Sequence, residues 1–156
     1  GVGIQEGGVA GGDPLAHPRT GIVFDGGGGA AAKLLPLFRF GLGGRLGDGG
    51  QYWSLISLAD EVAALRFLLE RDDVEGPVNL TAPSPVTNAR LTEELGRQLR
   101  RPTLLTVPGF ALRIALGEMA VEVLGSQRVE PRALLRHGFV FRHPHLADIV
   151  AAGLRR

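Results

Sequence analysis

Cysteine is absent from the 156 residues of this sequence. Its absence excludes disulfide bonds and thiolate metal sites, and it favours a reducing, cytoplasmic location. Aromatic residues are also scarce, at 6%, so the core must rest on Leu, Val and Ala. The longest apolar stretch, 104–124, is interrupted by Arg and Glu residues. Such a pattern is typical of a helix in a globular protein and not of a membrane span, and we expect no membrane partner.

A strong net charge is missing as well, because the formal net charge is only +1. The basic residues of the second half are mostly arginines scattered along predicted helices. A nucleic-acid-binding surface would carry a denser basic stripe, so we expect no nucleic-acid partner. Among the histidines, His137, His143 and His145 are neighbours in the sequence. No carboxylate or cysteine completes a ligand set with them, and we expect no metal site.

Short β-prone runs alternate with helical patterns along the chain, in a sequence that is 44% hydrophobic. This alternation indicates an α/β or α+β fold. The expected strands are 22–24, 51–57, 78–80, 103–107 and 139–141. The expected helices are 30–40, which Pro36 should end or kink, and 58–71, 88–100, 109–124, 131–137 and 146–155.

Two local signals refine this pattern. Ser57 and Thr87 are suited to cap the helices that follow them, because a hydroxyl can accept a hydrogen bond from the first turn. Gly-rich residues 41–50 are expected to form a loop. In the helix 58–71, we expect the buried face to carry Leu58, Val62, Leu65 and Leu69.

A family resemblance rests on two segments, which are Arg19–Val23 and Gln51–Asp60. Together with further stretches they resemble the extended short-chain dehydrogenase/reductases, in the nucleoside-diphosphate-sugar epimerase-like branch with the C-terminal domain of unknown function DUF1731. The further stretches are 33–36, 41–44, 76–83, 126–129 and 138 onward.

The resemblance implies a partial Rossmann-like fold, the C-terminal half of the family's enzymes, with a small α+β domain on the substrate side. It divides the chain into a flexible Gly-rich lead-in at 1–18, an epimerase-like portion at 19–100 and a DUF1731-like domain at 101–156. It also implies NAD or NADP as cofactor and a nucleotide-sugar-like small molecule as substrate. We do not expect the cofactor to bind tightly to this chain alone.

The catalytic pair of the family is missing. Relatives use a Tyr and a Lys four residues apart, but here the single Tyr is Tyr52, and Ile56 stands four residues later. The single Lys, Lys33, lies upstream. Without a paired Lys, nothing lowers the pKa of a tyrosine proton donor. The glycine run 26–29 also lacks the full dinucleotide fingerprint, so we predict no catalytic residue in this chain.

Three residues match the strand end that approaches the nicotinamide in the family, namely Thr20, Gly21 and Ile22. Glycine would allow the close approach of a flat ring. The alternative is an ordinary buried strand.

Five residues are candidates for substrate binding, namely Arg45, Gln51, Trp53, Asn79 and Arg128. An arginine can hold a diphosphate through two parallel hydrogen bonds. Gln51 could bond a sugar or base edge, Trp53 could stack, and Asn79 stands at a strand end where open α/β sheets bind ligands. The alternatives are solvated charges for both arginines, packing for Trp53 and a turn role for Asn79.

The sequence thus favours a fragment of an NAD(P)-dependent epimerase/dehydratase-like protein that is inactive alone, and it leaves open whether the chain is an enzyme. Two alternatives remain. The chain could be a non-catalytic binding or dimerisation module, with a second copy as its partner. It could also be one chain of a split enzyme, whose partner would be the missing N-terminal half.

Overall fold

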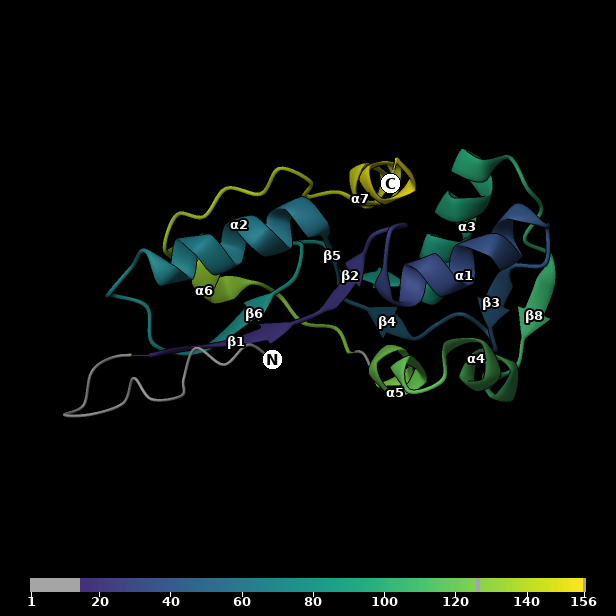
Figure 1. Ribbon diagram of the computed structural model, residues 1–156, viewed down its shortest axis with the longest axis horizontal. Coiled ribbons are helices and arrows are strands. Elements are labelled where there is room, and N and C mark those ends of the chain that lie inside the picture. Colours follow the sequence, from purple (N-terminus) through teal and green to yellow (C-terminus); the bar gives the residue numbers. More distant parts are fainter. Residues whose placement is uncertain (1–14, 126, 156) are drawn as a thin grey trace.

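The computed structural model describes residues 15–125 and 127–155. Its elements lie along one long axis (Figure 1), with α2, α6, β1 and β6 at one end and α1, α3, α4, β3 and β8 at the other. The strands are β1 (Ala16–Thr20), β2 (Ile22–Phe24), β3 (Gly44–Leu46), β4 (Tyr52–Trp53), β5 (Leu55–Ser57), β6 (Gly76–Leu80), β7 (Val86–Thr87) and β8 (Leu105–Val107). The helices are α1 (Gly29–Arg39), α2 (Leu58–Leu69), α3 (Asn88–Leu99), α4 (Gly109–Leu116), α5 (Met119–Leu124), α6 (Arg132–Arg136) and α7 (Leu146–Leu154).

The strands pair mainly in parallel, as in α/β proteins. β1 pairs with β6, β2 with β5 and β3 with β8, all parallel, whereas β4 and β7 are antiparallel. The chain changes partners at Gly21: the Gly21 N–H donates to the Leu80 carbonyl at 3.1 Å, and the next N–H, of Ile22, donates to the Ser54 carbonyl at 2.8 Å. The predicted α/β class is confirmed.

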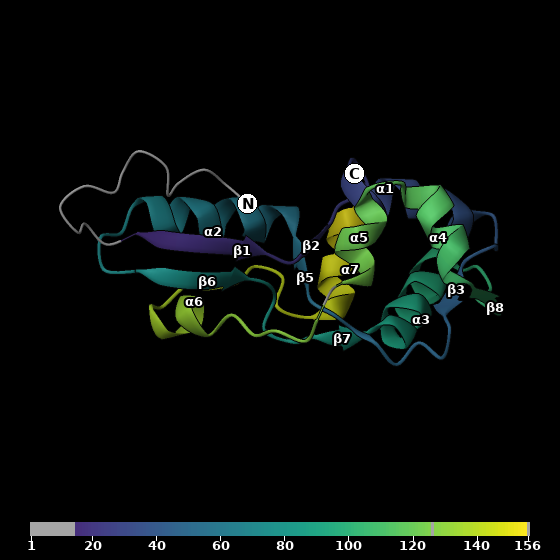
Figure 2. The ribbon, with the colours of Figure 1, turned by 90° about the horizontal axis from the view of Figure 1, so that it is seen from below.

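Two apolar clusters form the core, one in each part. The first joins β2 and β5 to α1, α3, α4, α5 and α7. The second lies between α2, β1, β6 and α6, and Figure 2 shows α2 along β1 and α6 along β6. Along β1 burial alternates, so that Ala16 and Pro18 are buried while His17 and Arg19 are exposed. One face of this strand pair therefore packs on the core, and the other carries the exposed side chains of His17 and Arg19.

Glycine-rich segments hold more structure than expected. β1 starts at Ala16, so the flexible lead-in was wrong for 16–18, while 1–14 lie outside the described residues. The predicted loop 41–50 contains β3, because Gly44 lets that strand lie against β8: a Cβ on Gly44 would clash with the Leu105 carbonyl oxygen.

Helix limits follow the backbone conformation of single residues. The helix predicted over 109–124 is two helices, because Gly117 adopts a positive φ of 61° between them. α1 continues past Pro36 to Arg39. The strand predicted at 139–141 was wrong: Phe139 instead packs edge-on against Phe67 and Phe141, with ring centroids 5.3 and 4.9 Å apart.

The buried face of α2 differs from the prediction. Val62 and Leu69 are exposed, while Asp60, Ala64 and Leu68 are buried. The Ser57 cap is confirmed, since its Oγ accepts from the Asp60 N–H at 3.2 Å. The helix is turned so that the Asp60 carboxylate reaches the backbone of the C-terminal segment, where it accepts the N–H groups of Arg142 and His143, each at 2.8 Å.

Candidate functional site

Two of the predicted substrate residues, Asn79 and Arg128, line one open cavity of about 520 Å³. Asn79 comes from β6 and Arg128 from the segment before α6. The other lining residues are Pro77, Val129, Glu130, Arg132, Ala133 and Arg136. Three arginines thus face the same space as one glutamate, and the cavity is suited to an anion.

The arginine-bearing segment is held in place by polar contacts. The Ser54 hydroxyl donates to the Gln127 carbonyl at 2.6 Å and accepts the Val129 N–H at 3.0 Å. The Asn79 Nδ2 donates to the Glu130 carbonyl at 3.3 Å. The Arg128 guanidinium lies 5.3 Å from the ring centroid of Tyr52, a cation–π contact that orients it.

Arg132, Arg136 and Tyr52 were missed by sequence reasoning. For the arginines a signal existed, because Arg128, Arg132 and Arg136 recur at intervals of four residues. The role of Tyr52 carried no signal, since its contact with Arg128 joins residues far apart in the sequence. The Glu130 carboxylate lies 3.4 Å from Nε of Arg132 and offsets part of the positive charge.

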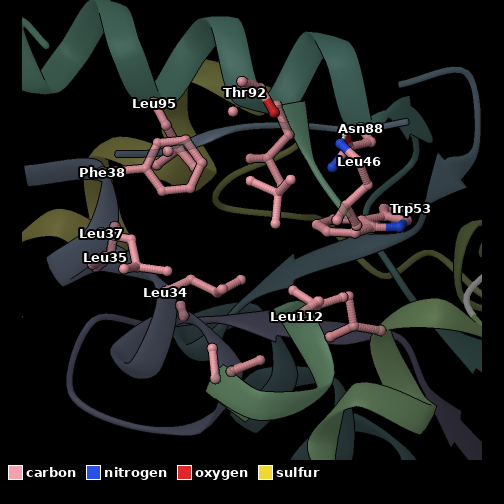
Figure 3. A pocket seen from close by; sticks show the side chains of 18 of the residues that line it. Leu34, Leu35, Leu37, Phe38, Leu46, Trp53, Asn88, Thr92, Leu95 and Leu112 are labelled. Atoms are coloured by element: carbon pink, nitrogen blue, oxygen red, sulfur yellow. Dashed lines mark hydrogen bonds between the residues drawn. The ribbon is translucent and has the colours of Figure 1, made fainter. Parts of the chain in front are cut away.

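The other predicted substrate residues do not line this polar cavity. Arg45 is exposed on β3, and the Gln51 Nε2 donates to the Leu46 carbonyl at 3.3 Å. Trp53 is buried in the wall of a separate apolar cavity, shown in Figure 3 beside Leu46. Asn88, in the same wall, accepts the Leu46 N–H through Oδ1 at 2.8 Å.

The residues predicted to meet the cofactor are engaged within the chain. The Thr20 hydroxyl donates to the Glu61 carboxylate at 2.9 Å. A Cβ on Gly21 would lie 2.5 Å from the Ser54 carbonyl oxygen, so packing within the chain already requires glycine here. Ile22 is buried in the apolar core. Their contact with a cofactor stays a prediction.

Burial raises the pKa of the Glu61 carboxyl, although its hydrogen bond from Thr20 opposes this. The folded state therefore holds the proton to higher pH than the unfolded state, so the stability contributed by this group falls as pH rises from about 4.5 through the folded pKa. We expect Glu61→Gln, which keeps an acceptor for Thr20, to be more stable than the wild type at pH 7 and to lose this advantage at pH 4. Urea denaturation at both values measures it. If Glu61→Gln were more stable than the wild type by the same amount at both pH values, the raised pKa of Glu61 would be contradicted.

Two other kinds of site are absent from the described part of the chain. No cluster of three or more His, Asp or Glu residues that could hold a metal ion occurs there. None of the described helices is long and apolar enough to span a membrane. Tyr52 lies on strand β4 and Lys33 on helix α1. They are therefore not the family's Tyr/Lys pair, whose members stand four residues apart in the sequence.

Known proteins agree with this architecture. Residues 107–152 match a domain of unknown function, DUF1731. An epimerase family protein of Mycobacterium bovis is 48% identical over 139 residues, which are 88% of this chain and 46% of that protein. The crystal structure of the human epimerase family protein SDR39U1 with NADPH superposes with a TM-score of 0.82 at 32% identity, over 92% of this chain and 49% of that one. The chain belongs to the epimerase family.

Within this family, the chain corresponds to a C-terminal part of an extended short-chain dehydrogenase/reductase. It spans about half the length of the curated relatives it matches. A nucleoside-diphosphate sugar epimerase from Corynebacterium glutamicum superposes with a TM-score of 0.70 at 30% identity, over 90% of this chain and 26% of that protein. The division of the chain at residue 100 stays a prediction. Helices on both sides of it contribute to one apolar cluster.

Proposed function

We propose that this chain forms the substrate-binding part of an NAD(P)-dependent epimerase-like protein and is catalytically silent alone. The observation that carries the proposal is the polar cavity in which Asn79 and Arg128 meet Arg132 and Arg136. A nucleotide-sugar-like ligand carries a diphosphate, whose oxygens match the paired N–H groups of arginine. No catalytic residue is assigned, because the only Tyr and the only Lys are not four residues apart.

The contacts of the cavity support diphosphate binding. Tyr52 orients the Arg128 guanidinium, and Ser54 fixes the backbone on both sides of it. Arg132 is an exposed side chain paired with Glu130 at 3.4 Å, and it can turn from that pair to an incoming phosphate. Because the arginines lie near solvent, we propose weak binding that high salt suppresses.

The cofactor part of the proposal rests on the strand end Thr20–Ile22. The human relative was crystallised with NADPH, and we propose that NAD or NADP meets the same strand end in the complete protein. Here Thr20 bonds Glu61 through its hydroxyl, and Ile22 is buried. The Gly21 and Ile22 N–H groups are also bonded within the chain, so the strand end offers a cofactor too little for tight binding to this chain alone. A cytoplasmic location belongs to the same proposal.

Calorimetric titration with uridine diphosphate tests the anion site. We expect saturable binding that Arg128→Gln weakens at least tenfold, since one hydrogen bond to a charged group contributes about 1.5–3 kcal/mol. Arg113→Gln serves as the matched control, because Arg113 is an exposed arginine of α4 outside the cavity. Equal binding by wild type and Arg128→Gln would overturn the assignment.

A specific observation also favours the interaction-module alternative. β1 carries the exposed side chains of His17 and Arg19, and it pairs only with β6 among the described residues. An unpaired strand edge can add a strand from another chain, either a second copy or a separate N-terminal half. Sedimentation that shows a monomer at high concentration would exclude the dimer. Co-purification with a chain bearing the glycine fingerprint would instead support the split enzyme.

A further inference from the structure

A second cavity, of about 290 Å³, lies between α1, α3 and α4 (Figure 3). No charged side chain lines it, and its polar side chains are Asn88, Thr92, Thr106 and the indole of Trp53. It shares no lining residue with the polar cavity. A diphosphate has no charged partner in such a wall, so the cavity requires a different kind of ligand.

The size and lining of this cavity suit an apolar ligand. Protein interiors are close-packed, and side chains beside an empty space lose dispersion contacts. Cavities lined by apolar side chains stay dry and take up apolar molecules instead of water. The volume lies near the lower end of the range of about 300–1,000 Å³ that is usual for ligand pockets.

Two lining residues mark the mouth of the cavity. Leu42 and Leu105 both line it, yet they are 53% and 50% exposed. Their sequence neighbours Phe40 and Leu104 are exposed still further, at 80% and 89%. The mouth therefore lies between the segment after α1 and strand β8, and its rim is apolar.

The two segments that form the mouth carry positive charge only. Residues 33–47 and 99–117 contain no Asp or Glu. Their basic residues are Lys33, Arg39, Arg45, Arg100, Arg101 and Arg113. The Arg101 Nε donates to the Arg39 carbonyl at 2.9 Å, which brings the two segments together at the end of α1. An apolar interior with a basic surround matches a molecule that has a hydrocarbon tail and an anionic head.

We propose that this cavity binds a medium-chain fatty acid. The tail lies among the leucines of α1, α3 and α4, and the carboxylate stays at the mouth, within the field of Arg39 and Arg101. This site is separate from the diphosphate site and does not depend on it. The two ligands therefore bind without competing.

Trp53 supplies a direct measurement, because it is the single tryptophan of the sequence and lines the cavity. Bromine quenches indole fluorescence on contact, so bromine-substituted decanoate is the probe. We expect saturable quenching in the intact chain below the micellar concentration, with no effect of added uridine diphosphate. Absence of saturable quenching would overturn the proposal, and competition by uridine diphosphate would contradict the separation of the two sites.

Variants test the tail and the head separately. Ala111→Phe adds volume inside the cavity and should weaken binding at least tenfold, while circular dichroism confirms the fold. Leu42→Glu places a negative charge at the mouth, which repels the carboxylate of decanoate and should weaken its binding. Val62→Glu adds the same charge at an exposed position of α2 and should leave decanoate binding unchanged. Arg101→Gln should weaken brominated decanoate more than the brominated alcohol of equal length. Wild-type affinity in both Ala111→Phe and Leu42→Glu would place the ligand elsewhere and overturn the proposal.

Discussion

Replacing Asp60 by alanine is expected to lower the free energy of unfolding by about 3 kcal/mol or more. The side chain is 1% exposed, and its two oxygens accept the N–H groups of Arg142 and His143. Hydrogen bonds to charged groups contribute about 1.5–3 kcal/mol each, and their removal leaves both donors unsatisfied. Urea denaturation measures the loss, and hydrogen exchange at these two amides should accelerate beyond the global change.

The control for this substitution is Asp148→Ala. Asp148 is also an acid in the first turn of a helix, α7, but it is exposed. A charge at such a position contributes only about 0.3–1 kcal/mol. Equal losses for the two variants would show that Asp60 acts only through the helix dipole and does not hold the C-terminal segment.

Replacing Gly21 by valine should destabilise the chain by about 3 kcal/mol. Even a Cβ would lie 2.5 Å from the Ser54 carbonyl oxygen and 2.7 Å from Cγ2 of Thr81. That carbonyl accepts the Ile22 N–H at 2.8 Å, so moving it away weakens the start of the β2–β5 pairing. Forcing extra atoms into a packed core costs about 1–3 kcal/mol, and valine adds two methyl groups beyond the Cβ. Thermal denaturation measures the change.

Gly28→Ala is the control for Gly21. Nothing lies within 4 Å of a Cβ at Gly28, and its φ of −172° is open to any residue. Restriction of the unfolded chain contributes about 0.4–1 kcal/mol to stability. Gly28 is the N-cap of α1, where alanine is a poorer cap than glycine, so we expect a net change close to zero. If Gly21→Val were as stable as Gly28→Ala, the close packing at the strand switch would be contradicted.

Local signals in the sequence predicted local structure well. Thr87 caps α3 as expected, with its Oγ1 accepting the Arg90 N–H at 3.2 Å, because a cap depends on residues within one turn. The predicted buried face of α2 was wrong because it depends on residues far away in the sequence. Asp60 is buried by partners 82 and 83 residues away, and no periodicity within a helix reveals them.

The candidate site shows the same limit. Asn79 and Arg128 were predicted separately, and the fold brings them into one cavity. Trp53 was predicted beside them, but the pleat of β4 turns it into the apolar core while its neighbour Tyr52 reaches Arg128. Adjacent residues of a strand point to opposite faces. The family resemblance at 51–60 predicted the strand, but it did not predict which of its side chains lies beside Arg128.

One experiment on the purified chain tests whether it binds a nucleotide sugar and is catalytically silent alone. Uridine diphosphate glucose and the oxidised cofactor NAD(P)+ are added together, while calorimetry follows binding of the nucleotide sugar and absorbance follows reduction of the cofactor. We expect saturable, Arg128-dependent binding of the nucleotide sugar with no change in either the cofactor or the sugar. Conversion of the sugar or reduction of the cofactor by this chain alone would contradict it.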